Sequence, residues 1–176
     1  MKKLLFVLSF LVMANPAIAD TWTSSFSEEG KAKALCPSTN ALRGIQCTGR
    51  YCDNISLGCG SLGNFKVKKD WWTRSISEEK RGGKDTVDDI VVRINNNMQR
   101  CGTKGYVAGM SCKGKYCDNI SLYCKEFRNK TPHSCKWTGW ISEERGGKLV
   151  FGSGKYAVAV KCKGKFCDQK KFLVCH

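Results

Sequence analysis

The sequence predicts an all-β protein built from three tandem, disulfide-stapled repeats of short antiparallel strands. Three observations support this fold class: a cysteine spacing that recurs, a tryptophan motif ahead of each cysteine block, and apolar residues with a period of two. Four cysteines separated by 11, 5 and 7 positions occur in the first repeat and again in the second. They are Cys36, Cys47, Cys52 and Cys59, followed by Cys101, Cys112, Cys117 and Cys124.

Residues 1–19 have the pattern of a bacterial-type secretory signal peptide. Lys2 and Lys3 are followed by the apolar run Leu4–Met13 and by a small-residue cleavage signature that ends at Ala19. The run is shorter than the roughly 20 apolar residues that a spanning helix needs, and no later segment approaches that length. We therefore expect a periplasmic or secreted protein with no transmembrane segment.

The mature chain divides into three copies of one unit. Each copy has a motif of the form Trp-Thr-x-x-(Phe/Ile)-Ser-Glu-Glu, which begins at Trp22, Trp72 and Trp137. The cysteine blocks that follow are CTGRYCDNISLGC, CKGKYCDNISLYC and CKGKFCDQKKFLVC. We place the repeats at 21–70, 71–135 and 136–176, with connectors at 64–70 and 126–134.

The third repeat departs from the cysteine pattern. Phe151 stands where the other repeats have their first cysteine, and an extra Cys135 precedes the tryptophan motif. The remaining cysteines of this repeat are Cys162, Cys167 and Cys175. Because the count of twelve is even and export implies an oxidising compartment, we expect disulfides, with Cys135 supplying the missing partner so that each repeat closes its own bridges. Four cysteines allow three pairings, so connectivity within a repeat stays open.

A metal site is not predicted, and neither is any other cofactor. The cysteine spacings are not CxxC, and the chain has only two histidines, whereas zinc sites combine closely spaced cysteine and histidine ligands.

The strand pattern is clearest in the third repeat. Apolar residues from Tyr156 to Cys162 alternate with a second series that becomes basic at Lys161, Lys163 and Lys165. This alternation predicts a half-buried strand with one basic face. Elsewhere, the segment 85–92 fits a short helix and a strand equally.

The same period of two assigns faces to the tryptophans. Trp22 and Phe26 are four positions apart, so the motif tryptophans are expected in the core together with the Phe or Ile that follows. Trp71 and Trp140 then fall on the opposite face and are the expected exposed aromatic residues.

Units of about 40 to 65 residues have marginal cores without cross-links, so the disulfides are expected to be structural. Two assemblies are compatible with three such units. One is a pseudo-threefold trefoil-like or prism-like arrangement, and the other is a row of beads.

The charge points to an anionic partner. The net charge is +15, of which Lys2 and Lys3 contribute two, so the mature chain carries +13. Such a surface concentrates polyanions around itself. Glycans or anionic polysaccharide are the expected partners, with nucleic acid less favoured, and the charge alone also suits plain solubility.

Four kinds of residue are candidates for ligand binding. Exposed tryptophans offer a flat platform for a sugar ring, and a stripe of lysines can meet a polymer at several points. The recurring glutamates and aspartates could bond sugar hydroxyls, although ion pairing and tight turns are structural alternatives for them. The candidates are Trp71, Trp140, Lys113, Lys115, Lys161, Lys163, Lys165, Glu28, Glu78, Glu143, Asp53, Asp118 and Asp168.

Catalysis is not expected, because the chain has no GxSxG elbow, P-loop or HExxH motif. A glycosidase with paired carboxylates is the remaining catalytic reading, but three similar copies favour repeated binding sites over one active site. We expect an exported, non-enzymatic, lectin-like or adhesin-like protein that recognises glycans or anionic polymers. The alternative is a secreted disulfide-rich toxin, effector or inhibitor acting on a protein or membrane.

Overall fold

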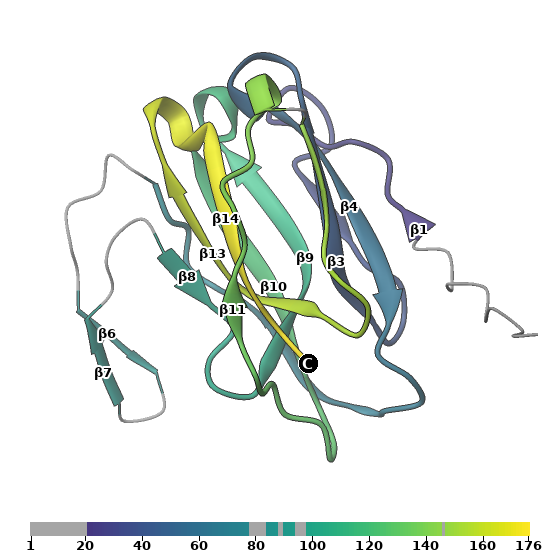
Figure 1. The fold of residues 1–176 in the computed structure, drawn as a ribbon. Helices are drawn as coiled ribbons and strands as arrows, with labels where there is room; N and C mark the ends of the chain where they lie inside the picture. Colours follow the sequence, from purple (N-terminus) through teal and green to yellow (C-terminus); the bar gives the residue numbers. More distant parts are fainter. Residues whose placement is uncertain (1–20, 78–83, 88–89, 94–97, 146) are drawn as a thin grey trace, which may run out of the picture.

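The computed structural model describes residues 21–77, 84–87, 90–93, 98–145 and 147–176 (Figure 1). This part of the chain forms three four-stranded antiparallel sheets and one two-stranded sheet, and its helical segments are short 3-10 turns. The predicted all-β class is confirmed.

Each four-stranded sheet is built around a hairpin made by the cysteine block of one repeat. The hairpins are β3 (Asn40–Thr48) with β4 (Asn54–Ser61), β9 (Gly105–Lys113) with β10 (Asn119–Phe127), and β13 (Tyr156–Lys163) with β14 (Gln169–Cys175). A short strand at each tryptophan motif pairs with the second hairpin strand. These strands are β1 (Thr21–Trp22), β5 (Val67–Trp72) and β11 (Lys136–Trp137). The expected connector at 64–70 is therefore partly strand.

The fourth strand of each sheet comes from a different repeat. β2 (Lys33–Leu35) of the first repeat joins the second repeat's hairpin, β8 (Met98–Arg100) of the second joins the third, and β12 (Lys148–Val150) of the third joins the first. The resulting sheets are sheet A (β1-β4-β3-β12), sheet B (β2-β9-β10-β5) and sheet D (β11-β14-β13-β8). Since each repeat gives one edge strand and receives another, no hairpin has its full sheet without its neighbour.

The two-stranded sheet, sheet C, consists of β6 (Lys84–Val87) and β7 (Ile90–Arg93). It occupies the segment that fitted a helix or a strand equally, and the strand reading is the correct one.

The inner faces of the three hairpins share one hydrophobic core. Fully buried side chains from all three repeats belong to a single cluster, including Ile45, Ile55, Met110, Ile120, Val160 and Phe172. Burial of each such side chain stabilises the fold by about 1.5 to 3 kcal/mol. A row of separate beads is therefore wrong, because the repeats bury their apolar faces against one another.

All twelve cysteines lie in the described part of the chain and are paired. The first and second repeats have the same connectivity, Cys36–Cys59 with Cys47–Cys52, and Cys101–Cys124 with Cys112–Cys117. In the third repeat Cys162 pairs with Cys167, and Cys135 pairs with Cys175. The prediction that Cys135 replaces the missing cysteine is confirmed. Six disulfides fit an extracellular or periplasmic protein.

The described residues include no helix of the length and apolarity needed to cross a membrane.

Three tight turns join the hairpin strands and meet at the upper end of the molecule in Figure 1: η1 (Arg50–Cys52), η2 (Lys115–Cys117) and η4 (Lys165–Cys167). The glycine before each turn has a φ of 72° to 76°. A Cβ atom at Gly49 would collide with the carboxylate of Asp53, so only glycine fits there. The carboxylates of Asp118 and Asp168 lie in the same way over their own glycines.

The predicted face of the motif tryptophans is wrong. Trp22 lies opposite Gly58, and Phe26 lies opposite Ile55. The two residues are four positions apart, whereas their partners on β4 are three positions apart. The additional residue acts as a bulge, which turns the tryptophan outward while Phe26 enters the core. The second and third repeats have the same offset.

The exposure predicted for the second repeat is reversed. Trp71 lies opposite the buried Cys124 and is half-buried against the core, whereas Trp72 lies opposite Tyr123 on the outer face and is 39% exposed. Trp140, the other expected exposed tryptophan, is half-buried.

Candidate functional site

The outer face of sheet D gathers tryptophan and basic side chains from all four strands or their flanks. Cross-strand partners in an antiparallel sheet point to the same side, so the pairings Trp137 with Leu173, Lys161 with Lys171, and Ala159 with Arg100 place these residues together. We call this surface the basic face. It is defined by Arg100, Trp137, Trp140, Lys161, Lys163 and Lys171.

Two lysines of the basic face, Lys163 and Lys171, lie against its indole rings. The Nζ atom of Lys171 lies 5.0 Å from the ring centre of Trp137 and 4.8 Å from that of Trp140. The Nζ atom of Lys163 lies 4.4 Å from the ring centre of Trp140. These distances are within the range of cation–π attraction, so the ring faces are partly covered by ammonium groups.

Two like charges face each other at the centre of the basic face. Lys161 of β13 is the direct cross-strand partner of Lys171 of β14. Like charges in directly opposite positions destabilise a sheet. The residues that the pairings place on this face include no acid, and the described residues form no ion pair with either lysine. Within the described part of the chain, the positive charge of this face is therefore unbalanced.

The equivalent pairs in the other two sheets are neutral. Gln46 faces Ser56 in sheet A, and Ser111 faces Ser121 in sheet B. The backbone arrangement is the same in all three sheets, so the lysine pair is a property of the third repeat's side chains and not a requirement of the fold.

The predicted stripe of three lysines is divided between two places. Lys161 and Lys163 lie on the outer side of β13, as the alternation predicted, whereas Lys165 lies in the turn η4 beyond the end of the strand. In the second repeat Lys113 is exposed at the end of β9, and Lys115 lies in η2.

The turns bring together an aromatic cluster that sequence reasoning did not identify. The rings of Tyr51, Tyr116 and Phe166 contact one another at centre-to-centre distances of 4.9 to 5.3 Å. Lys115 and Lys165 lie over Tyr116 and Phe166 at 5.4 and 5.2 Å, and Arg50 lies over Tyr51 at 5.1 Å. The repeated Gly-(Arg/Lys)-(Tyr/Phe)-Cys sequence was a signal that these rings have equivalent places. This cluster closes one end of the shared core.

Two of the candidate glutamates bond the turns of other repeats. The carboxylate of Glu28 accepts a hydrogen bond from the backbone N–H of Tyr116 at 2.6 Å, and that of Glu143, in η3 (Glu143–Arg145), accepts one from Tyr51 at 2.8 Å. Glu78 lies outside the described residues. The arrangement gives Glu28 and Glu143 a role in holding repeats together.

Two of the three candidate aspartates also have structural partners. Oδ1 of Asp53 and of Asp118 accepts a hydrogen bond from the side-chain amide of the asparagine that follows, Asn54 and Asn119. Burial raises the pKa of Asp168 above its usual value.

Near these turns, Glu28 approaches the Cys112–Cys117 disulfide, whose sulfurs cannot act as thiolate metal ligands.

A lysine occupies a core position in the third repeat. Lys170 pairs with Ile141 and is fully buried, at the position of Ile55 and Ile120 in the other repeats. Its Nζ donates a 2.7 Å hydrogen bond to the carbonyl of Cys167. Burial lowers the pKa of Lys170 to about 8, an effect opposed by the nearby negative charges.

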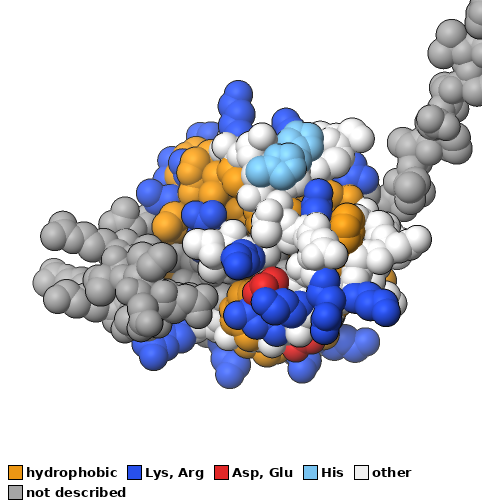
Figure 2. Space-filling view, turned by 90° about the horizontal axis from the view of Figure 1, so that it is seen from below, with side chains coloured by type: hydrophobic (Ala, Val, Ile, Leu, Met, Phe, Trp, Pro, Cys, Tyr) orange, Lys and Arg blue, Asp and Glu red, His pale blue; other side chains and the backbone are white. Residues whose placement is uncertain are grey.

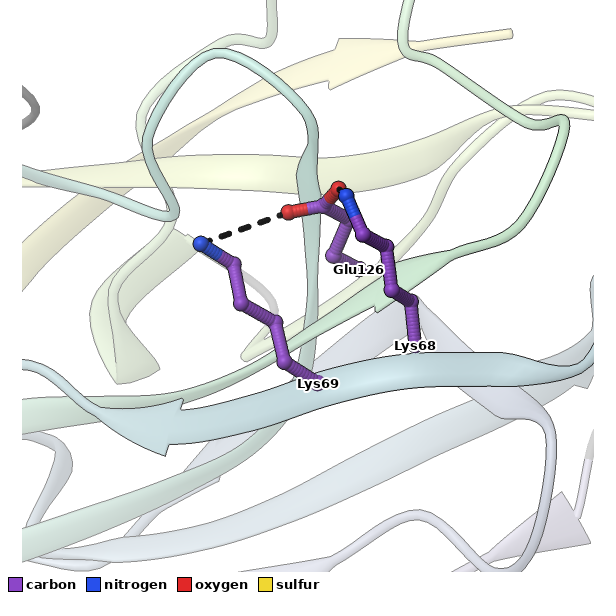
Figure 3. A network of polar contacts seen from close by, with 3 residues as sticks. All are labelled: Lys68, Lys69 and Glu126. Atoms are coloured by element: carbon purple, nitrogen blue, oxygen red, sulfur yellow. Dashed lines mark hydrogen bonds and ion pairs between the residues drawn. The ribbon is translucent and has the colours of Figure 1, made fainter.

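Sheet B has a cleft of about 540 Å³ that contains another of the candidate residues, Trp71. In this cleft Lys68 and Lys69 form ion pairs with Glu126, at 3.0 and 3.5 Å (Figure 3). These ion pairs were not predicted, because the lysines and the glutamate lie 57 or more positions apart, in two segments expected to be connectors.

Comparison with known proteins adds no further guide to function. No protein-family model matches the chain, and neither does any curated protein or solved structure. The function is therefore argued from the geometry of the sites.

Proposed function

We propose that this chain is an exported, non-catalytic binding protein that recognises anionic polysaccharide through the basic face of sheet D. The observation that carries the proposal is the opposed pair Lys161 and Lys171, flanked by Lys163 and two tryptophans, with no acid of the described residues paired to them. An anionic ligand would offset the repulsion between the two opposed ammonium groups. The proposed ligand is thus an acidic polysaccharide, whereas the sequence alone suggested glycans or anionic polymers.

The tryptophans favour an anionic over a neutral sugar polymer. Each indole of the basic face is half-buried and has a lysine ammonium within 5.0 Å of its ring centre. A ligand that approaches either ring therefore meets a positive charge first. Carboxylate or sulfate groups can bond the ammonium groups while the sugar ring contacts the remaining indole surface.

The extent of the positive surface suits a polymer. Arg100 of the edge strand β8 pairs with Ala159 of β13. At the other end of the face, Lys163 is followed directly by the turn that contains Lys165. Several weak contacts with successive anionic groups of one chain add up to useful affinity.

The positions of the glutamates support binding rather than glycoside cleavage. Glu28 and Glu143 each accept a hydrogen bond from a backbone N–H of another repeat. A carboxylate engaged in holding a turn is poorly placed to donate a proton to a leaving group or to attack a sugar.

The test is binding of the oxidised mature protein to heparin and to polygalacturonate, with neutral dextran as the comparison polymer. The variant Lys161→Ser/Lys171→Ser copies the neutral pair of sheet B and is expected to lower affinity for the acidic polymers about tenfold, since each exposed charge pair contributes up to about 1 kcal/mol. Increasing salt should weaken binding of the original chain more steeply than that of the variant.

The matched control is Lys31→Ser/Lys33→Ser, which removes the same charge from exposed positions outside the basic face. Retained affinity in this control and lost affinity in the Lys161/Lys171 variant support the proposal. Equal loss in both variants would mean that only the overall charge matters, and binding to dextran with the same affinity would contradict an acidic ligand.

A further inference from the structure

The cleft of sheet B is a second site with features different from those of the basic face. It lies along β5 and β10 beside the turn 101–105, and its volume of about 540 Å³ is within the range of small-ligand sites. Its walls are formed by Lys68, Lys69, Trp71, Lys104 and Glu126, together with the turn.

A buried carboxylate organises the positive groups of the cleft. The side chain of Glu126 is only 9% exposed, and its two oxygens contact the Nζ atoms of Lys68 and Lys69 (Figure 3). The hydrogen bond from Lys68 lowers the pKa of Glu126, in keeping with an ionised carboxylate. The two lysine side chains are 55% and 53% exposed, so their remaining N–H donors are accessible to a ligand.

The indole of Trp71 forms a rigid wall. The ring packs against the core, and a Cβ atom at Gly105 would lie 2.8 Å from its Cη2 atom. The glycine therefore lets the backbone of the turn approach the ring closely. The Nζ atom of Lys69 lies 5.2 Å from the ring centre, which places a positive group beside an aromatic surface.

The charge of the cleft selects a ligand with one negative group. Three lysines and two acids line it, the second acid being Asp70, which leaves one net positive charge. Burial, together with the nearby Asp70, raises the pKa of Tyr123. On the face seen from below, Lys and Arg side chains lie beside the few Asp and Glu side chains that this view shows (Figure 2).

The geometry points to a binding site for a single acidic pyranose, a sugar unit with one carboxylate or sulfate group. The indole would support the ring, Lys69 and Lys104 would bond the anionic group, and Glu126 would hold the lysines in place. This site is separate from the basic face and does not depend on polymer binding there.

The indole N–H signals of the five tryptophans provide a direct test, because each tryptophan reports on its own surroundings. Titration of the oxidised protein with glucuronic acid and with glucose 6-sulfate should shift the Trp71 signal, with a dissociation constant on the order of 1 mM. Glucose should bind at least about tenfold more weakly, because it lacks the charged hydrogen-bond partner. The two acidic ligands distinguish a carboxylate from a sulfate preference.

Variants that keep the side-chain stem locate the site. Lys69→Met and Lys104→Met should each weaken binding of the acidic sugar about tenfold, whereas Lys66→Met, an exposed neighbour outside the cleft, should leave it unchanged. The Lys161→Ser/Lys171→Ser variant should also retain it, so the two sites can fail independently. An unchanged Trp71 signal, equal binding of glucose, or no effect of Lys69→Met and Lys104→Met would overturn the proposal.

Discussion

The outer faces of sheets B and D have the same strand arrangement and different side chains. In sheet B, Trp72 lies beside Tyr123 with 5.2 Å between ring centres, next to the neutral pair of Ser111 and Ser121. In sheet D, the corresponding pair is Lys161 and Lys171. Sheet B has a neutral central pair with a single lysine, Lys33, opposite Ser111 on the edge strand, whereas sheet D has two opposed lysines between tryptophans.

The repeated fold and the proposed binding site therefore depend on different side chains. Disulfides, turns and core positions recur in the repeats, because each hairpin needs them to pack against the other two. The outward positions are free to differ, and only the third repeat has two opposed lysines between tryptophans. Function on this scaffold depends on a few outward side chains.

The largest expected effect comes from converting the face of sheet D into that of sheet B. The variant Lys161→Ser/Lys171→Ser/Trp140→Ser places serine at three positions where the second repeat has Ser111, Ser121 and Ser75. Loss of two charges and one indole should lower affinity for acidic polysaccharide about a hundredfold, as measured by calorimetry or surface binding. Far-UV circular dichroism should show that the β-sheet fold is retained, since the three positions lie on the outer face of the sheet.

The comparison extends to the buried side, where Ile120 of sheet B corresponds to Lys170 of sheet D. Lys170→Ile should raise the free energy of unfolding at pH 7 by about 2 kcal/mol, because an apolar side chain replaces a buried charge. Chemical denaturation of the oxidised protein gives the measurement. A lower stability of the variant would show that the hydrogen bond to Cys167 outweighs the cost of burial.

The stability gained by Lys170→Ile should depend on pH, because the pKa of Lys170 is lowered from its ordinary value of 10.5 to about 8 in the folded protein. Below pH 8 the lysine is charged in both states, and its burial cost is fully present. Between pH 8 and 10.5 only the unfolded chain holds the proton, so the original protein gains stability as the pH rises. The advantage of Lys170→Ile should therefore shrink over this interval, and a constant advantage would contradict the shift.

The smallest expected effect is the reverse conversion of sheet B. Ser111→Lys/Ser121→Lys recreates the opposed lysines and should lower stability by about 0.5 kcal/mol through repulsion. Affinity for acidic polysaccharide at low salt should rise a few-fold through a second contact point. A control with Ser111→Gln/Ser121→Gln separates charge from side-chain size, and an equal rise in both variants would argue against the charge.

Sequence patterns were sufficient for features that repeat. The cysteine spacing predicted the repeats and the role of Cys135, and the period of two placed Lys161 and Lys163 on an outward face. The edge-strand exchange was not predictable, because β2, β8 and β12 have three residues each and carry too little pattern to show their partners.

Which face of a sheet a single residue occupies was harder to predict from the sequence. Lys170 and Lys171 are neighbours, yet one is in the core and the other between two indoles. Alignment of the repeats carried the missing signal, since Lys170 falls on Ile55 and Ile120. The motif tryptophans were misplaced because a bulge changes the alternation after Trp22, and nothing in the local composition marks that extra residue.

The most direct test of the central claim is to titrate the oxidised protein with a defined acidic hexasaccharide while recording the indole N–H signals. We expect the signals of Trp137 and Trp140 to shift first and most, while those of Trp22 and Trp72 on the other two sheets stay in place. Shifts at Trp22 or Trp72 with none at Trp137 and Trp140 would contradict recognition by the basic face.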